Sequence, residues 1–390
     1  MNLNKKDRNF ELIDLKLDLL LEGINVEDSA LYGLGTLYRE EIHWLFEWDS
    51  HNHEARLSPS EIIFEENDMI TQVYENEKSS YKLIRDREKD KLILLKNNNP
   101  MDVPVKYPTR PKVLSECTSD GIPISKIVGF RGVDCMSVSF SLYCKFWDTM
   151  RQCKFCNIQN TKELSEQKAI KQAEWISEAI SMAYKNKEIN HFIITGGTFD
   201  KEVAWVERIF NQIKEKTGMD YFPGSNCTMT APVTTENLKL MSNFGSDFLS
   251  MNLEIYSEEI FKQLCPGKDW QVGYRNWINR LIEAVDYKGW GHVRSNFVAG
   301  LEPMESLMEG AEFLASKGVL PAFIPFKKPF SPNVKDYSYT KEDYWKLTIF
   351  FNELYEKYNL QPSYCHKCYC NSTYIDYHTF FVKNNPEMVL

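Results

Sequence analysis

The stretch VDCMSVSFSLYCKFWDTMRQCKFCNIQN (133–160) joins a short apolar run to a loop that holds three cysteines. The run 133–140 has the apolar, β-forming character of a strand. Cys144, Cys153 and Cys156 follow it and precede a long helix-like segment, 163–187. The sequence therefore predicts three thiols in the loop between a strand and the helix that follows it.

Strand-like runs alternate with helix-like segments along the rest of the chain. The strand-like runs are 133–140, 191–195, 220–229, 248–255, 292–300 and 320–326. The later helix-like segments are 201–217, 234–243, 274–287, 303–317 and 341–358. Thr234 and Thr340 are typical of helix starts, and Gly289, Gly291 and Gly318 of helix ends.

Six consecutive βα units imply a parallel sheet, because each helix returns the chain to the same end of the next strand. We therefore predict an α/β fold whose sheet is open or rolled into a partial (βα)6 barrel. The loops at the C-terminal ends of the strands should carry the chemistry. The expected organisation is an N-terminal accessory region (1–125), a (βα)6 core (126–335) and a C-terminal helix with a Cys-rich extension (336–390).

Composition narrows the class of protein. The 390 residues are 43% hydrophobic, enough for one large core with a smaller attachment. Lys and Arg number 46 against 55 Asp and Glu, and a net charge of −9 disfavours a nucleic-acid partner. No apolar stretch reaches the roughly 18 residues of a membrane helix, and charges interrupt the first segment where a signal peptide would be apolar. We expect a cytoplasmic protein with no membrane partner.

Ten cysteines in such a chain indicate metal rather than disulfides, because a reducing compartment keeps thiols free. Three thiols without an obvious fourth ligand suit an iron–sulfur cubane with one open iron. Zinc is the alternative, although a structural zinc site normally closes with a fourth Cys or His. Four cysteines stand apart from the groups and are expected to be buried small side chains: Cys117, Cys135, Cys227 and Cys265.

A cysteine triplet that ends in CKFC, directly after the first strand of a (βα)6 series, resembles the radical S-adenosylmethionine (SAM) superfamily over roughly residues 130–330. The resemblance implies a [4Fe–4S] cluster on Cys144, Cys153 and Cys156, whose open iron binds the amino and carboxylate groups of SAM. The family commonly shows Cys-x3-Cys-x2-Cys, whereas this chain has Cys-x8-Cys-x2-Cys. Cys135 therefore competes for the first position, and we choose Cys144 because Cys135 falls within the predicted strand.

The resemblance also suggests SAM contacts at the other strand ends. Gly196, Gly197 and Thr198 are similar to the family's Gly-Gly-Glu motif, which contacts the SAM amino group, with Thr198 in place of the Glu. Glu254, in MNLEIYSEEIFKQLCPGK (251–268), would bind ribose hydroxyls, and this stretch resembles the biotin-synthase and hydrogenase-maturation branch. Phe155, between the last two cluster cysteines, would cover the edge of the adenine.

The fifth strand region, HVRSNFVAGLEP (292–303), supplies three further candidates. Arg294 and Asn296 alternate with Val293, Ser295 and Phe297 and should share one face of the sheet. A buried arginine needs an anionic partner, and the SAM carboxylate is expected, with an ion pair to Glu254 as the alternative. Gly300 begins a segment that resembles the family's adenine-binding region.

A second cysteine group lies in PSYCHKCYCNSTY (362–374), after the last predicted helix. Cys365, Cys368 and Cys370 place three sulfurs within six residues, which favours metal binding over core packing. An auxiliary Fe–S cluster and a zinc site are both compatible with this spacing, and no fourth ligand is identified.

The resemblance implies that SAM is cleaved to methionine and a 5′-deoxyadenosyl radical, which removes hydrogen from a small-molecule substrate. An amino-acid-like molecule or a cofactor precursor is expected, with sulfur insertion, C–C cleavage or rearrangement as the outcome. A flavodoxin- or ferredoxin-type donor would supply the electron in an anaerobic setting. The alternative from another class is a zinc-stabilised protein that binds a metabolite or partner without redox chemistry.

Overall fold

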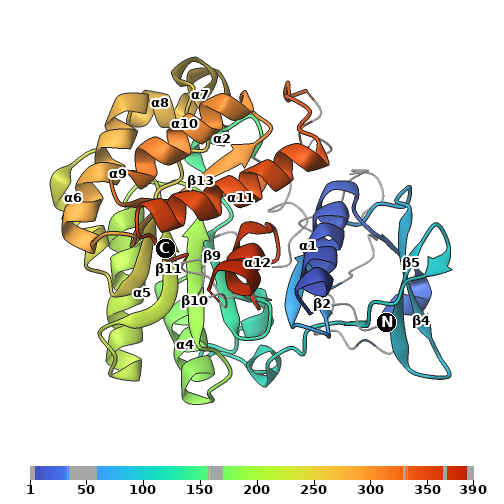
Figure 1. Cartoon of the computed structure of the whole chain (residues 1–390). Helices are drawn as coiled ribbons and strands as arrows, with labels where there is room; N and C mark the ends of the chain where they lie inside the picture. Colours follow the sequence, from blue (N-terminus) through green and yellow to red (C-terminus); the bar gives the residue numbers. More distant parts are fainter. Residues whose placement is uncertain are drawn as a thin grey trace.

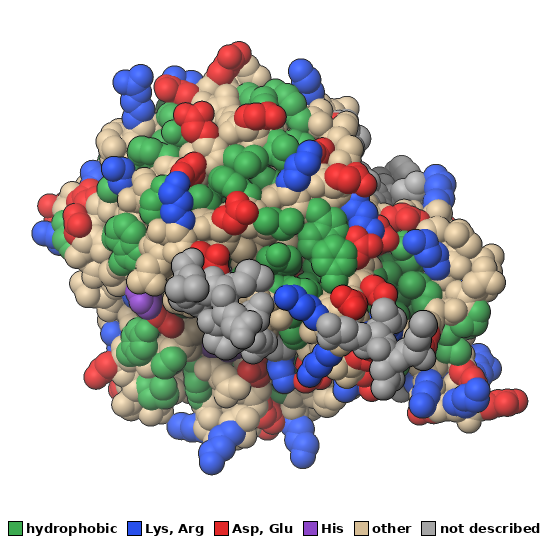
Figure 2. All heavy atoms as spheres, in the orientation of Figure 1, with side chains coloured by type: hydrophobic (Ala, Val, Ile, Leu, Met, Phe, Trp, Pro, Cys, Tyr) green, Lys and Arg blue, Asp and Glu red, His purple; other side chains and the backbone are tan. Residues whose placement is uncertain are grey.

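The computed structural model describes residues 5–32, 34, 59–156, 158, 170–327, 331, 333–362 and 367–383, and within them the chain forms two seven-stranded sheets (Figure 1). In Figure 1 the N-terminal sheet (β1–β7) and α1 lie on one side of the molecule, and the barrel sheet (β8–β14) with its helices lies on the other. On the face drawn in Figure 2, basic and acidic side chains are interspersed. No helix in the described ranges is both long enough and apolar enough to cross a membrane.

The barrel sheet contains the six predicted strands, all parallel, in the order β14-β13-β12-β11-β10-β9. Their bounds are β9 Cys135–Ser141, β10 His191–Gly196, β11 Phe222–Thr228, β12 Ser246–Ser250, β13 Val293–Ala299 and β14 Val319–Pro325. A seventh strand that the sequence analysis did not predict, β8 (Gly129–Arg131), pairs antiparallel with β9. Three residues are too few for a readable period-2 pattern. The two end strands of this order, β14 and β8, do not pair with each other, so the sheet is an open, partial barrel, as predicted.

Helices connect the parallel strands. The predicted ones are α4 Ala173–Lys185, α5 Glu202–Thr217, α6 Thr235–Ser242, α9 Tyr274–Lys288, α10 Met304–Ala315 and α11 Lys341–Lys357. Thr234 caps α6 by accepting from the backbone N–H of Asn237, and Thr340 forms a capping box with Asp343 at α11. The predicted start of the first helix at residue 163 lies outside the described residues, and α4 begins at Ala173. Aromatic side chains such as Phe192, Phe210 and Phe222 fill the space between helices and sheet.

Within the described ranges, three further short helices lie between the parallel strands. The first, α2 (Lys145–Asp148), lies in the cysteine loop, and α7 (Glu258–Leu264) and α8 (Pro266–Gln271) follow β12. Ser257 caps α7, and Pro266 opens α8, where its missing N–H leaves no unpaired donor. These helices surround the C-terminal ends of the strands, so they shape the predicted site.

The N-terminal region has a hydrophobic core of its own. Its elements are α1 Lys5–Glu22, β1 Asn25–Val26, the 3-10 turn Asp28–Leu31, β2 Glu61–Phe64, β3 Met69–Gln72, β4 Tyr81–Asp86, β5 Lys91–Lys96, β6 Asn99–Pro100 and β7 Val105–Lys106. The strands follow the order β1-β4-β5-β7-β2-β3, with β6 on β5. Two 3-10 turns, Lys112–Ser115 and Ile124–Lys126, then lead into the barrel, whose core includes Val113 and Ile124.

The C-terminal segment joins the two parts. It holds α12 (Tyr374–Tyr377) and a π-helical turn, His378–Val382, and Figure 1 shows α12 between α1 and the barrel. Tyr374 belongs to the barrel core, whereas Phe381 belongs to the N-terminal core. Lys16 of α1 forms a fully buried ion pair with Asp376, at 2.6 Å. The segment therefore fixes the N-terminal region to the barrel.

Candidate functional site

The three cysteines of the loop after β9 lie at one cavity. Cys144, Cys153 and Cys156 line a space of about 210 Å³ at the C-terminal ends of β10 and β11, together with Thr195 and Thr228. Burial raises the pKa of Cys144 and brings that of Cys156 to about 12, and the neighbouring thiols add to both effects. Coordination by a cation would remove the protons that burial otherwise retains. Three thiols of this kind fit a metal cluster.

The turn after β10 packs directly on the cysteine loop. A Cβ at Gly197 would overlap the carbonyl of Tyr143 and lie 2.8 Å from Cys144 Cβ, so only glycine fits there. The backbone N–H groups of Phe146 and Thr198 bond to the Cys144 thiol and oppose the effect of burial on its pKa. Gly196, Gly197 and Thr198 also line the cavity, and their contact with SAM stays a prediction.

The α7–α8 turn packs on the other side of the cysteine loop. A hydrogen bond from Cys265 lowers the pKa of the Cys153 thiol. A Cβ at Gly267 would lie 2.5 Å from the ring of Phe146, and Lys154 N–H donates to the Leu264 carbonyl at 2.8 Å. Cys265 is fully buried, as expected, but its contact with a predicted cluster ligand was not foreseen.

Glu254 lies at the wall of the cavity, in an ion pair with Lys268. The Lys268 ammonium lies 2.9 Å from the Glu254 carboxylate, donates to the Asn252 carbonyl at 2.7 Å and stands 4.8 Å from the centre of the Trp277 ring. Burial alone would lower the pKa of Lys268, but the charges of Glu254 and the two nearby thiols raise it. Glu254 has a left-handed backbone, with φ of 72°, which turns the chain between β12 and α7.

These contacts correct the alternative partner for Arg294, because Glu254 pairs with Lys268 instead. Arg294 is buried and donates to the hydroxyls of Tyr369 and Tyr374, each at 3.1 Å. Both tyrosines come from the C-terminal segment, more than 70 residues away, so no local pattern could have shown them. Asn296 accepts from Arg294 at 3.3 Å.

Phe155, which was predicted to cover the adenine edge, lines the cavity. Three other residues predicted to contact SAM do not line it: Arg294, Asn296 and Gly300. Arg294 donates to Asn296 and to two tyrosines of the C-terminal segment, as described. The Gly300 carbonyl accepts from Tyr337 N–H at 2.8 Å, and its backbone φ of 106° favours glycine. The contacts of these three residues therefore give no support to a role in SAM binding.

Several wall residues were missed by the sequence analysis. They are Phe146, Trp147, Gln152, Ile158, Thr195, Thr228, Met229, Thr230, Asn252, Lys268 and Trp277. The CPGK turn (265–268) was noted as part of a resemblance, but its lysine was not proposed as a site residue. Thr230 hydrogen-bonds Thr198 through the two hydroxyls at 2.5 Å, and its N–H donates to Glu202. Burial raises the pKa of Glu202 to about 7.

The second cysteine group is divided by the fold. Cys365 lies outside the described residues. Cys370 packs with Ile63 and Ile70 of the N-terminal sheet, and the Arg131 guanidinium lies 3.9 Å from its sulfur. Cys368 instead donates to the Asp134 carboxylate at 2.8 Å. The expectation of one metal centre shared by the three thiols therefore stays a prediction, because the two described thiols have different surroundings.

Comparisons with known proteins agree with this architecture. Residues 149–314 match the model of the radical SAM superfamily. The bacteriochlorophyllide c C-7(1)-hydroxylase of Chlorobaculum limnaeum is 26% identical over 230 residues, covering 54% of this chain and 56% of the hydroxylase. The chain thus spans little more than half the length of that relative.

Two solved structures are also similar. Methylornithine synthase aligns with a TM-score of 0.42 and 17% identity, over 62% of this chain and 71% of that one. HydG, a maturase of the [FeFe]-hydrogenase, aligns with a TM-score of 0.43 and 15% identity, over 64% and 58%. These scores are low, so the fold described above rests on the strand order itself.

The matched range contains Cys153 and Cys156 but begins after Cys144, whose place at the cavity comes from the structure alone. The donor set fits a [4Fe–4S] cluster, because three thiols from one loop share a cavity wall. The chain is therefore an enzyme that contains a radical SAM domain, which the family model matches over residues 149–314 within the parallel (βα)6 half-barrel.

Proposed function

We propose that Cys144, Cys153 and Cys156 hold a [4Fe–4S] cluster and that the adjoining cavity binds SAM. The observation that carries this proposal is the meeting of all three thiols with the Gly-Gly-Thr turn at one cavity. When bound, the reduced cluster supplies the electron that cleaves SAM to methionine and a 5′-deoxyadenosyl radical. The chain itself binds SAM, orients it and excludes water.

The wall residues suggest how the chain would hold SAM. The turn from Gly196 to Thr198 offers backbone carbonyls and one hydroxyl to the amino group. Glu254 gives one oxygen to Lys268, and its other oxygen is proposed to accept from ribose hydroxyls. Phe155 supplies an apolar surface for the adenine edge. Lys268 holds the Glu254 carboxylate in place, which makes it a positioning residue.

The substrate is proposed to be a small molecule that loses an unactivated hydrogen to the radical. The hydroxylase from Chlorobaculum, by its name, acts on C-7(1) of a bacteriochlorophyllide. A cofactor precursor is therefore a natural class of substrate here, and an amino-acid-like molecule is the other class considered. We further propose a flavodoxin- or ferredoxin-type electron donor and an anaerobic cytoplasmic setting, which protects the cluster.

A comparison of two cysteine variants tests the proposal. Cys144→Ala should lose cluster iron and 5′-deoxyadenosine formation after anaerobic reconstitution, because one of three ligands is removed. Cys135→Ala is the matched control, since Cys135 is buried within β9 and its thiol donates to the Met136 carbonyl. It should keep both properties. The readouts are iron per chain, the visible absorption spectrum and 5′-deoxyadenosine by chromatography.

Two outcomes would contradict this assignment. Loss of iron in Cys135→Ala with full retention in Cys144→Ala would make Cys135, and not Cys144, the third cluster ligand. A colourless wild-type protein that binds zinc at these thiols and leaves SAM intact would instead support the non-redox alternative.

A further inference from the structure

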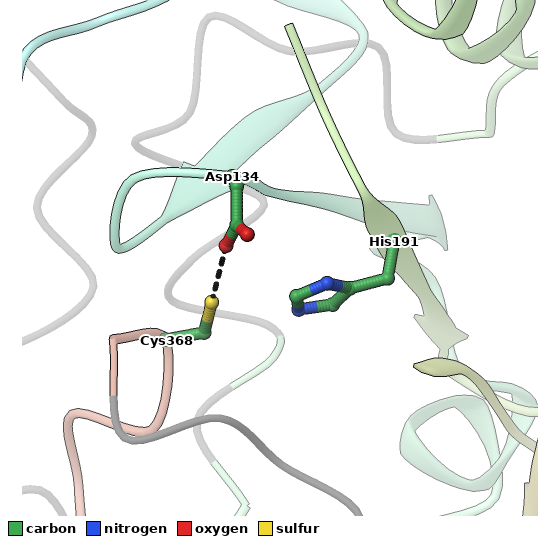
Figure 3. Close-up of side chains that lie close together, drawn as sticks. All are labelled: Asp134, His191 and Cys368. Atoms are coloured by element: carbon green, nitrogen blue, oxygen red, sulfur yellow. Dashed lines mark hydrogen bonds between the residues drawn. The ribbon is translucent and has the colours of Figure 1, made fainter. Parts of the chain in front are cut away.

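A second cluster of metal-ligating side chains lies at the opposite end of the barrel from the candidate SAM site. Asp134, His191 and Cys368 each place one ligand atom within 4.8 Å of the other two (Figure 3). Figure 3 shows the three side chains converging from three separate segments. His191 is the first residue of β10, at its N-terminal end. A strand of seven residues such as β9 is about 20 Å long, so this cluster is far from the cysteine loop at the other end.

Two of these three residues are held by the sheet. Asp134 directly precedes β9, and His191 is the register partner of Cys135, the first residue of that strand. Asn190 reinforces the arrangement, because its N–H donates to the Asp134 carbonyl at 3.0 Å and its side-chain amide to the Asp134 carboxylate at 2.8 Å. The carboxylate therefore has a fixed position before any ion binds, and the sheet fixes the backbone of His191 beside it.

The third residue arrives from the C-terminal segment. Cys368 is buried, and its thiol donates to one oxygen of Asp134 at 2.8 Å. The chain beside it is tightly packed, because a Cβ at Gly132 would lie 2.8 Å from the Cys368 Cα. Lys367 pairs with Asp68 of the N-terminal region at 2.9 Å. The thiol thus meets the carboxylate at the junction of the barrel, the N-terminal sheet and the C-terminal segment.

We propose that Asp134, His191 and Cys368 bind a single zinc ion that fastens the C-terminal segment to the barrel. Thiolate, imidazole and carboxylate are the three ligand types that zinc takes in proteins. In a tetrahedral site the ligand atoms lie about 3.5 Å apart, so the present spacing needs only small side-chain movements. On binding, the Cys368 thiol releases its proton to solvent and its hydrogen bond to Asp134 is lost. The sulfur and the Asp134 carboxylate then both bond to the metal. The described residues thus supply three of the four ligands that a tetrahedral zinc site takes.

The ligand set favours zinc over an iron–sulfur cluster at this place. Fe–S clusters are held by several cysteine thiolates, whereas the described residues bring one thiolate together with a nitrogen and an oxygen donor. Cys370, only two residues away, points to Ile63 and Ile70 instead. The role of the ion is structural, because it lies far from the candidate SAM cavity, and the inference does not depend on the proposed function.

Zinc content of the full-length chain tests the inference. The Cys153→Ala/Cys156→Ala chain removes two thiols of the first site, so zinc that remains belongs elsewhere. We expect one zinc per chain in this background by plasma mass spectrometry after anaerobic dialysis. His191→Gln and Cys368→Ser should each weaken zinc binding at least about 100-fold in chelator competition, since loss of even a supporting contact costs 10- to 100-fold. Cys370→Ser is the matched control and should bind zinc unchanged.

A second measurement covers the case in which a variant fails to fold. Zinc added to the metal-depleted chain should slow hydrogen exchange in residues 367–376, and Co²⁺ in its place should give a thiolate charge-transfer band. The inference is overturned if the chain retains well under one zinc, or if zinc leaves the exchange of this segment unchanged. It is also overturned if Cys370→Ser loses as much zinc as Cys368→Ser, or if iron occupies Cys368.

Discussion

The ion pair between Lys268 and Glu254 should stabilise the fold as well as the candidate SAM cavity. Lys268→Met keeps the apolar stem but removes the ammonium, which contacts Glu254, the Asn252 carbonyl and the Trp277 ring. Breaking a buried ion pair on one side costs about 3–5 kcal/mol. Each side chain keeps 14% of its exposure, so we expect the lower end, about 3 kcal/mol. With a urea m-value of about 3 kcal/mol/M, the unfolding midpoint should fall by about 1 M.

Urea unfolding of the metal-free chain, followed by far-ultraviolet circular dichroism, measures this shift. Lys262→Met is the control, because Lys262 forms an exposed ion pair with Glu258 one helical turn away and should leave the midpoint unchanged. The double variant Glu254→Gln/Lys268→Met should recover part of the loss, since it leaves no unpaired charge. Equal midpoints for Lys268→Met and Lys262→Met would refute the reasoning. In the loaded enzyme, Lys268→Met should also raise the KM for SAM.

Two further ion pairs give distinct expectations. Lys16→Met should lower the free energy of unfolding by about 3–5 kcal/mol in guanidinium denaturation, because it leaves Asp376 fully buried without its partner; a loss under about 1 kcal/mol would contradict this. His292 lies 3.0 Å from Asp247, whose hydrogen bond raises the pKa of the imidazole above 6.5. Because the folded pKa is the higher one, this pair stabilises fully below about pH 6.5 and loses its contribution as the pH rises through the folded value. The imidazole is partly exposed, so we expect about 0.5 kcal/mol between pH 6 and pH 9, and His292→Gln should remove that difference.

Local patterns were sufficient for the barrel. Strand-like runs of five to ten residues and helices with clear caps are encoded by neighbours in the chain. The order of βα units then leaves few possible topologies. The same logic placed Cys144 in a loop at the functional end of the sheet and kept Cys135 in a strand. The strands of the N-terminal sheet and β8 were not foreseen, and those of two or three residues carry no readable period.

Non-local contacts decided the rest. The sequence alone determined that three thiols follow the first strand, that a Gly-Gly turn follows the second, and that a radical SAM domain was to be expected. Only the tertiary structure decided that Cys265 contacts Cys153 and that tyrosines of the C-terminal segment accept hydrogen bonds from Arg294. It also decided that Asp134, His191 and Cys368 lie together. These partners are separated by 57 to more than 200 residues in the chain. Their meeting depends on which strands are neighbours and on where the C-terminal segment packs, and neither leaves a periodic signal in the sequence.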